Sequence, residues 1–194
     1  TTIGKMAHLD DATLEEFLAF NKKFYVPNNA TLVVAGDIDI ESAKKLIEDY
    51  FGPIPRGKDI ERSFPKEDPI TEAISAKGYD SNIQIPAIMA AYRTPSMKTR
   101  DSRILDMVSS YFSSGKSSIL YKKLVDTKKM ALQVGAINLS QEDYGTYILF
   151  GLPQGETKLA DIISEIDEEV LKMQTDLISE KAYQKLQNQF ENNY

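Results

Sequence analysis

Two pairs of strand-like runs constrain the fold of this 194-residue chain most strongly. Residues 70–79 and 83–93 are joined by a three-residue polar turn, and residues 130–139 and 144–152 by a four-residue polar turn. Because connections this short join antiparallel strands, each pair is predicted to form a hairpin. Such a sheet needs helices to cover it, which predicts an α+β fold with an antiparallel-rich sheet and long helices packed on it, rather than a doubly wound sheet.

Four amphipathic runs supply the helices that this sheet needs. They are predicted at about 104–112, 118–126 and 159–170, and from 179 onward, with apolar residues recurring at helical spacing. The second part of the chain therefore has the order strand pair, helix pair, strand pair, helix pair.

The N-terminal part is organised around residues 24–39. A capping box that begins at Thr13 predicts a helix, and Pro27 ends it because a residue before proline disfavours helical geometry. The β-branched run 31–35 is predicted to be a strand buried on both faces. Asp39 is predicted to cap a second helix.

Prolines concentrate in one stretch between these two parts. Residues 53–69 hold four of the eight prolines, with charges of both signs between them. Pro-rich, charged sequence of this kind is typical of connections between compact units. The stretch is therefore interpreted as a linker and a domain boundary.

The charge of the chain argues against general nucleic-acid binding. The formal net charge is −6, whereas nucleic-acid binding needs a basic face. The acidic residues of the 159–170 helix are interpreted as a solvated face. They are Asp161, Glu165, Glu168 and Glu169.

Composition excludes several kinds of chemistry. The chain has no cysteine, which excludes thiol catalysis, disulfides and Cys-based metal sites, and leaves the compartment open. It has a single histidine, so a self-contained zinc site, which draws on His and Cys, is disfavoured. No run approaches the roughly 18 apolar residues of a membrane span.

Two short motifs have ordinary structural explanations. The Gly-Lys-Ser at 115–117 occurs in phosphate-binding loops, but Ser110 stands where that motif needs a glycine, so the motif is interpreted as a helix-breaking loop. His8 beside Asp10 and Asp11 could trap a metal, yet polar residues before a helix are the simpler interpretation. Residue chemistry by itself predicts no catalytic group.

Longer motifs resemble one protein family. Residues 25–29, Tyr-Val-Pro-Asn-Asn, precede a predicted strand that ends in Gly-Asp, and residues 50–55 are Tyr-Phe-Gly-Pro-Ile-Pro. Residues 115–124 match Gly-x-x-Ser-x-Leu-Tyr-x-x-Leu. Together these resemble the pitrilysin/insulinase-like zinc metallopeptidases, which include the mitochondrial processing peptidases. The resemblance implies a processing-peptidase/metallohydrolase-like domain.

The resemblance also implies where the chemistry lies. Family members hold zinc on His-x-x-Glu-His with a downstream Glu, and the Glu of the motif acts as base on the zinc-bound water. This chain has no such motif, so no catalytic or metal-binding residue is predicted in it, and zinc is expected in the catalytic domain of a parent protein. The family's substrate-holding Arg and Tyr fall at Val125 and Leu132, so no substrate-binding residue is predicted either.

The resemblance predicts the following organisation. Residues 1–55 are the tail of a preceding family domain, 56–69 a linker, and 70–194 a non-catalytic family domain truncated at its C-terminal end. The chain is expected to be inactive alone and to form chamber wall and interdomain packing surface for a peptide substrate. The alternatives are a structural or binding subunit from a parent that has lost peptidase activity and, more remotely, an unrelated α+β ligand-binding module.

The expected partners are a catalytic zinc-bearing domain, in the same or a partner chain, and a peptide. Self-association is expected too, since a missing final strand would leave a sheet edge exposed. We further hypothesise that residues 31–35 pair into that vacant place, within one chain or between two. The bacterial periplasm is favoured over the cytoplasm.

Overall fold

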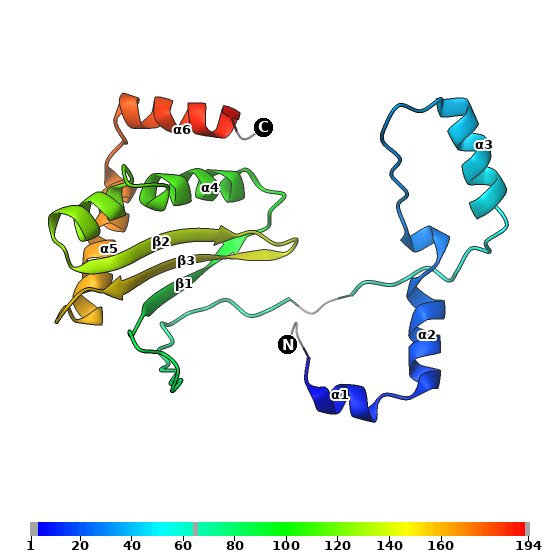
Figure 1. Ribbon diagram of the computed structural model, residues 1–194, viewed down its shortest axis with the longest axis horizontal. Coiled ribbons are helices and arrows are strands. Elements are labelled where there is room, and N and C mark those ends of the chain that lie inside the picture. Colours follow the sequence, from blue (N-terminus) through cyan, green and yellow to red (C-terminus); the bar gives the residue numbers. More distant parts are fainter. Residues whose placement is uncertain (1–3, 64–65, 193–194) are drawn as a thin grey trace. The chain divides into compact units, whose positions relative to one another are not determined.

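The computed structural model describes residues 4–63 and 66–192 (Figure 1). The chain divides into two compact units, residues 1–68 and residues 69–194. Each unit is described by itself.

The first unit contains four short helical elements: α1 (Met6–Asp11), α2 (Leu14–Phe24), η1 (Pro27–Asn29) and α3 (Ile40–Phe51). The predicted capping box is confirmed, since the Glu16 amide donates to Thr13 Oγ1 at 3.3 Å and the Thr13 amide donates to Glu16 Oε2 at 2.9 Å. Asp39 also caps α3 as predicted, accepting from the Ser42 amide at 2.9 Å.

The predicted strand at 31–35 is wrong within the described chain. These residues form no strand, and Leu32, Val33 and Val34 are 54%, 80% and 48% exposed. A β-branched run becomes a strand only when a neighbouring backbone pairs with it, and no described residue does so here. The hypothesis that this run pairs into a vacant place of the sheet, within one chain or between two, stays a prediction.

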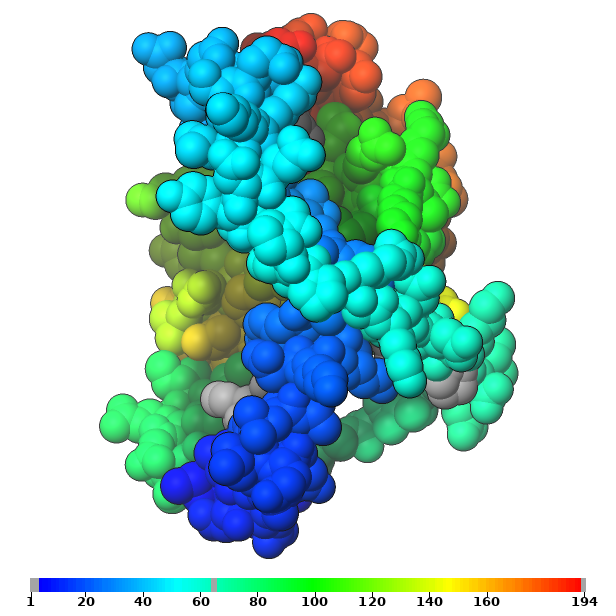
Figure 2. Space-filling view, turned by 90° about the vertical axis from the view of Figure 1, so that its right-hand side faces the viewer, coloured from blue at the N-terminus to red at the C-terminus, as the bar shows by residue number. Residues whose placement is uncertain are grey.

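The first unit has no core of its own among residues 4–63, where every residue is exposed or half-buried. In Figure 2 the atoms of α2 and α3, in blue and cyan, lie at the surface. An apolar hollow of about 670 Å³ lies among residues of α2, η1 and the end of α3, including Phe20, Phe24 and Phe51. The apolar stripes of these helices therefore lack a covering layer within the unit.

The described part of the second unit contains an antiparallel sheet in the order β1-β3-β2. Its strands are β1 (Ile88–Pro95), β2 (Ala131–Leu139) and β3 (Tyr144–Pro153). The predicted hairpin of the last two is confirmed, with Leu139 opposite Thr146 and a bulge near Ala131.

The first predicted hairpin is wrong. Residues 70–79 form no strand, and the second run begins its strand at Ile88 rather than Ile83. β1 pairs along its whole length with β3, not with the run before it. Ile74 and Tyr79 are 87% and 91% exposed, so the 70–79 run buries too little apolar surface to hold it in the sheet.

Helices α4 (Arg100–Ser113), α5 (Leu159–Thr175) and α6 (Glu180–Asn192) occupy the predicted places, and η2 (Tyr121–Thr127) is a π-helix where an ordinary helix was predicted. α4 and α5 share one hydrophobic core with the inward face of β3, and α6 packs against α4 (Figure 1). The mixed helix and antiparallel sheet confirm the α+β class. The buried core residues are Phe112, Leu120, Leu124, Ala131, Val134, Ala136, Tyr147, Leu149, Ile162 and Ile166.

Close contacts fix the helices on this sheet. A Cβ atom at Gly151 would lie 2.6 Å from Cγ2 of Ile162, so β3 and α5 approach each other at a distance that only glycine allows. On the other side of the core, Asn138 Nδ2 donates to Ser102 O at 3.0 Å and to Asp106 Oδ1 at 2.8 Å, which ties β2 to α4. Among the described residues, no helix is long and apolar enough to cross a membrane.

Candidate functional site

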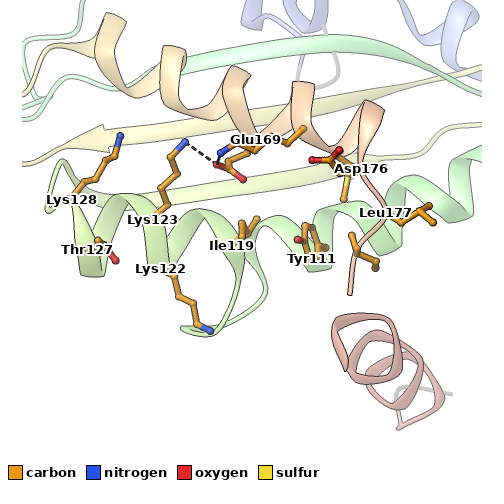
Figure 3. A pocket seen from close by; sticks show the side chains of 12 residues that line it. Tyr111, Ile119, Lys122, Lys123, Thr127, Lys128, Glu169, Asp176 and Leu177 are labelled. Carbon is orange, nitrogen blue, oxygen red and sulfur yellow. Dashed lines mark hydrogen bonds and ion pairs between the residues drawn. The ribbon is translucent and has the colours of Figure 1, made fainter. Parts of the chain in front are cut away.

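A groove of about 590 Å³ lies beside the π-helix of the second unit (Figure 3). α4, η2, the C-terminal half of α5 and the start of the following loop all contribute to it. Its walls combine lysines with apolar side chains, and Leu177 in the loop is 99% exposed. Its principal lining residues are Tyr111, Ile119, Lys122, Lys128, Met173 and Leu177.

One wall of the groove is an ion-pair hub centred on Lys123. The Nζ of Lys123 lies 2.9 Å from Oε2 of Glu165, 2.9 Å from Oε2 of Glu168 and 2.8 Å from Oε1 of Glu169. It also donates to the backbone oxygen of Glu165 at 3.2 Å. Side-chain exposures of 16% for Lys123 and 10% for Glu169 place the centre of the hub largely out of water.

Helical geometry presents the three carboxylates together. Glu165, Glu168 and Glu169 are at positions i, i+3 and i+4 of α5, so they share one face of that helix. Two further lysines complete the hub: Lys128 pairs with Glu165, and Lys172 lies 2.8 Å from Glu169. Three lysines thus balance three glutamates.

The hub shifts the pKa values of its members. Burial alone would lower the pKa of Lys123, but hydrogen bonds with Glu169, Glu168 and Glu165 outweigh it and raise that pKa above its ordinary value. Burial likewise opposes a lower pKa at Glu169, yet Lys123 and Lys172 lower it. Hydrogen bonds from Lys128 and Lys123 lower the pKa of Glu165. The charged forms of Lys123, Glu165 and Glu169 are therefore favoured by their neighbours.

The hub offers little to catalysis. A general acid or base needs a pKa near the working pH, and these shifts move the groups away from neutrality. The oxygens that could approach a metal surround the Lys123 ammonium instead. Burial and nearby Glu169 raise the pKa of Tyr111, which keeps its phenol protonated. The arrangement is chemically a cross-link between η2 and α5.

The residues present do not fit a zinc site. The single histidine, His8, is exposed on α1, and there is no cysteine. Across residues 4–63 and 66–192, no group of three or more His, Cys, Asp or Glu is arranged to hold a metal. His8, Asp10 and Asp11 lie within the short helix α1 and precede α2, the helix that the capping box predicted.

The two positions that the resemblance assigned to the family's substrate-holding residues lie on different elements. Val125 is in η2, half-buried against the core, and Leu132 is in β2, 50% exposed. Neither side chain can form an ion pair or donate a hydrogen bond. The Gly-Lys-Ser loop at 115–117 follows α4, and Lys185 of α6 donates to Ser117 Oγ at 2.5 Å.

Sequence reasoning missed the hub. The acidic face of α5 was interpreted as solvated, but Glu169 is buried and Glu165 is half-buried. The available signal was the i, i+3, i+4 spacing of the three glutamates, and it does not say which lysine faces them.

A second groove, of about 920 Å³, lies along the outer side of β1. Residues 69–74 form its other wall and form no strand. The backbone of β1 therefore pairs with β3 on one side only within the described chain.

Comparison with known proteins gives concordant results. A family model described as the peptidase M16 inactive domain matches residues 11–190. The zinc protease PqqE of Helicobacter pylori is 26% identical over 188 residues, which are 96% of this chain and 42% of that protein. The probable zinc protease PqqL of Escherichia coli is 30% identical over 106 residues, which are 52% of this chain and 11% of that protein.

Solved structures share the fold. A protease from Helicobacter pylori has a TM-score of 0.86 at 24% identity, over 98% of this chain and 46% of that one. The periplasmic protease PqqL from Escherichia coli has a TM-score of 0.69 at 20% identity, over 95% of this chain and 21% of that one. The chain thus spans less than half the length of these relatives, and at such identities the likeness establishes the fold alone.

Proposed function

The chain belongs to the M16 peptidase family through the inactive domain of that family, and on this premise we propose that it serves as the non-catalytic part of a zinc endopeptidase. Membership confirms the resemblance inferred from the motifs. The match of the inactive-domain model to residues 11–190 is the observation that carries the proposal. In this proposal the chain supplies chamber wall and packing surface, and a catalytic zinc-bearing half cleaves the peptide.

The side chains at the two family positions are compatible with this division of labour. Val125 and Leu132 replace a charged and a phenolic group, so peptide contacts made from these positions would be apolar. Zinc, bound in the other half by His-x-x-Glu-His, would activate the water that attacks the peptide. Substrate would be held mainly by backbone pairing with the catalytic half.

The proposed domain boundaries follow the same scheme. Residues 1–55 would close a preceding family domain, 56–69 would link, and 70–194 would form the inactive domain. The coreless state of residues 4–63 supports the first assignment, because helices with uncovered apolar stripes need a sheet from elsewhere. We also propose a periplasmic location, since the related PqqL is described as periplasmic.

Metal content and hydrolysis test the proposed function. The 194-residue chain alone is expected to bind less than about 0.1 zinc per chain and to leave unstructured peptides intact, because it lacks the ligand set. Metal analysis by mass spectrometry and a fluorogenic peptide assay measure both. With the half that carries His-x-x-Glu-His added, adjoining or as a separate chain, hydrolysis should appear and require zinc.

Two outcomes of this experiment would contradict the proposal. One tightly bound zinc in the isolated chain would overturn the assignment of chemistry to the other half. Absence of the motif from the parent and from every chain that co-purifies would favour the alternative, a structural or binding subunit whose parent has lost peptidase activity. Val125 and Leu132 are compatible with either function.

Self-association of the isolated chain is a separate prediction. Seven residues of β1, 89–95, line a groove along its outer edge, and exposed strand edges pair with other strands. Sedimentation velocity between about 5 and 200 μM should show a weight-average mass that rises with concentration, as expected for weak edge pairing. The variant Ala91→Pro places a proline on β1 and is expected to reduce the association. A monomer across the whole range would contradict the prediction.

A further inference from the structure

The π conformation of η2 is visible in the hydrogen bonds at its C-terminal end. The Lys128 amide donates to the Lys123 carbonyl, five residues back, at 2.9 Å. Just after η2, the Met130 amide donates to the Leu124 carbonyl, six residues back, at 2.9 Å. π-Helices are rare and mostly a single turn long, so this seven-residue run calls for interactions that favour it over an α-helix.

Apolar side chains in η2 and just before it face the hydrophobic core. Leu120 and Leu124 are completely buried, and Ile119 and Val125 pack partly buried against the same core. These four residues form two pairs five positions apart, 119 with 124 and 120 with 125. Residues five apart point closer together in a π-helix than in an α-helix, because the π-helix has more residues per turn. The π conformation of η2 therefore directs Leu124 and Val125 toward the same core as Ile119 and Leu120, which lie just before it.

Two lysines of the hub are also spaced five positions apart. Lys123 and Lys128 are five positions apart, and both pair with the carboxylate of Glu165. In an α-helix with 3.6 residues per turn, two such residues would point about 140° apart. One carboxylate on α5 would then be poorly placed to pair with both lysines.

From this agreement we propose that Lys123 and Lys128 form a register latch, which holds residues 121–127 in the π conformation by joining them to Glu165 of α5. Lys123 is a positioning residue, since it acts by fixing where its own helix turns. The latch sets the orientation of Val125 and is independent of whether the parent protein cleaves peptides.

Other charged groups at the latch reinforce Lys123 from α5. Glu168 and Glu169 accept from its ammonium, and Lys172 balances Glu169 from within the same helix. Lys172 and Glu169 are three residues apart on α5, so their ion pair does not connect α5 to η2. Lys172→Met is therefore a matched control, because it removes one charge and one contact with Glu169 but no contact between α5 and η2.

Amide hydrogen exchange by NMR on the whole 194-residue chain tests the latch. In Lys123→Met, the Lys128 and Met130 amides should exchange about tenfold faster, measured relative to the Leu149 amide of β3, which reports on opening of the core. Lys172→Met should change that ratio less than about twofold. Lys123→Arg keeps the charge and should restore much of the protection.

The outcomes separate a latch from a general contribution to stability. Equal acceleration at Leu149 and at the two reporter amides in Lys123→Met would overturn the proposal, and so would unchanged reporter amides. If Lys123→Met does not fold, Lys128→Met decides, because Lys128 is 41% exposed and its removal leaves the centre of the hub intact. That variant should accelerate the same two amides selectively, and unchanged ratios would overturn the latch.

Discussion

Replacing Leu149 by Ala is expected to lower the free energy of unfolding of the second unit by about 3–4 kcal/mol. Leu149 lies at the middle of β3, is 1% exposed, and belongs to the single core that α4, α5 and the sheet share. Truncation removes buried methyl groups and leaves a cavity that a sheet paired on both sides cannot close. Urea unfolding, followed by near-UV circular dichroism of the tyrosines, measures the change.

Leu132→Ala is the matched control for this prediction. It makes the same chemical change in the neighbouring strand β2, at a side chain that is 50% exposed. Its cost should stay below about 1 kcal/mol, since less apolar surface leaves water at that position on folding. Equal costs at the two positions would show that the core does not lie where this sheet and its helices place it.

Lys123→Met is expected to lower the free energy of unfolding by about 3 kcal/mol at neutral pH. The substitution leaves Glu165 and Glu169 mostly buried with one lysine each, and a buried charge without its partner is costly. Thermal and urea unfolding at pH 7 measure the loss. Lys44→Met, at an exposed pair with Glu41, is the control and should change stability by less than about 0.5 kcal/mol.

The pKa shifts of Glu165, Glu169 and Lys123 predict how the stability of the fold depends on pH. The pKa values of Glu165 and Glu169 are lowered in the folded protein. Their contribution is therefore present above the unfolded value of about 4.3 and is lost as the pH falls through the lower folded values. The raised pKa of Lys123 adds a contribution that is present below about 10.4 and is lost above it. Stability should be flat between about pH 5 and 10.

Acid should affect the variant differently. In Lys123→Met, burial of Glu169 is less opposed, so protonation relieves part of the penalty and the gap between variant and native protein narrows below about pH 4. Unfolding curves at pH 3.5 and pH 7 compare the two gaps. A gap that widens in acid would contradict the assignment of the stability loss to the hub carboxylates.

Local signals in the sequence predicted much of this fold. The cap at Thr13 and the cap at Asp39 were recognised because each depends on residues within one helical turn. The β2–β3 hairpin was recognised because its strands are joined by a short turn. In all three cases the groups that pair are close together in the chain.

The wrong predictions concern groups whose partners are far away in the sequence. Residues 31–35 and 70–79 have strand-like composition, yet neither is paired in the described chain, because a strand requires a partner that its own sequence does not specify. The hub joins Lys123 to a helix 42 residues away, and it depends on a π-turn that shifts which lysines share a face. The periodicity of apolar residues predicts where a helix lies more readily than whether it is an α-helix or a π-helix.

The absence of burial in residues 4–63 has a consequence for the lifetime of the chain in a cell. A segment held by no interior opens at almost no free-energy cost, so a protease can cleave it at nearly the rate of an unfolded peptide. The lifetime of this segment would then depend on how quickly another surface binds its apolar side chains, and little on its own stability. Under the proposed function, degradation would remove copies that do not pair with a catalytic half.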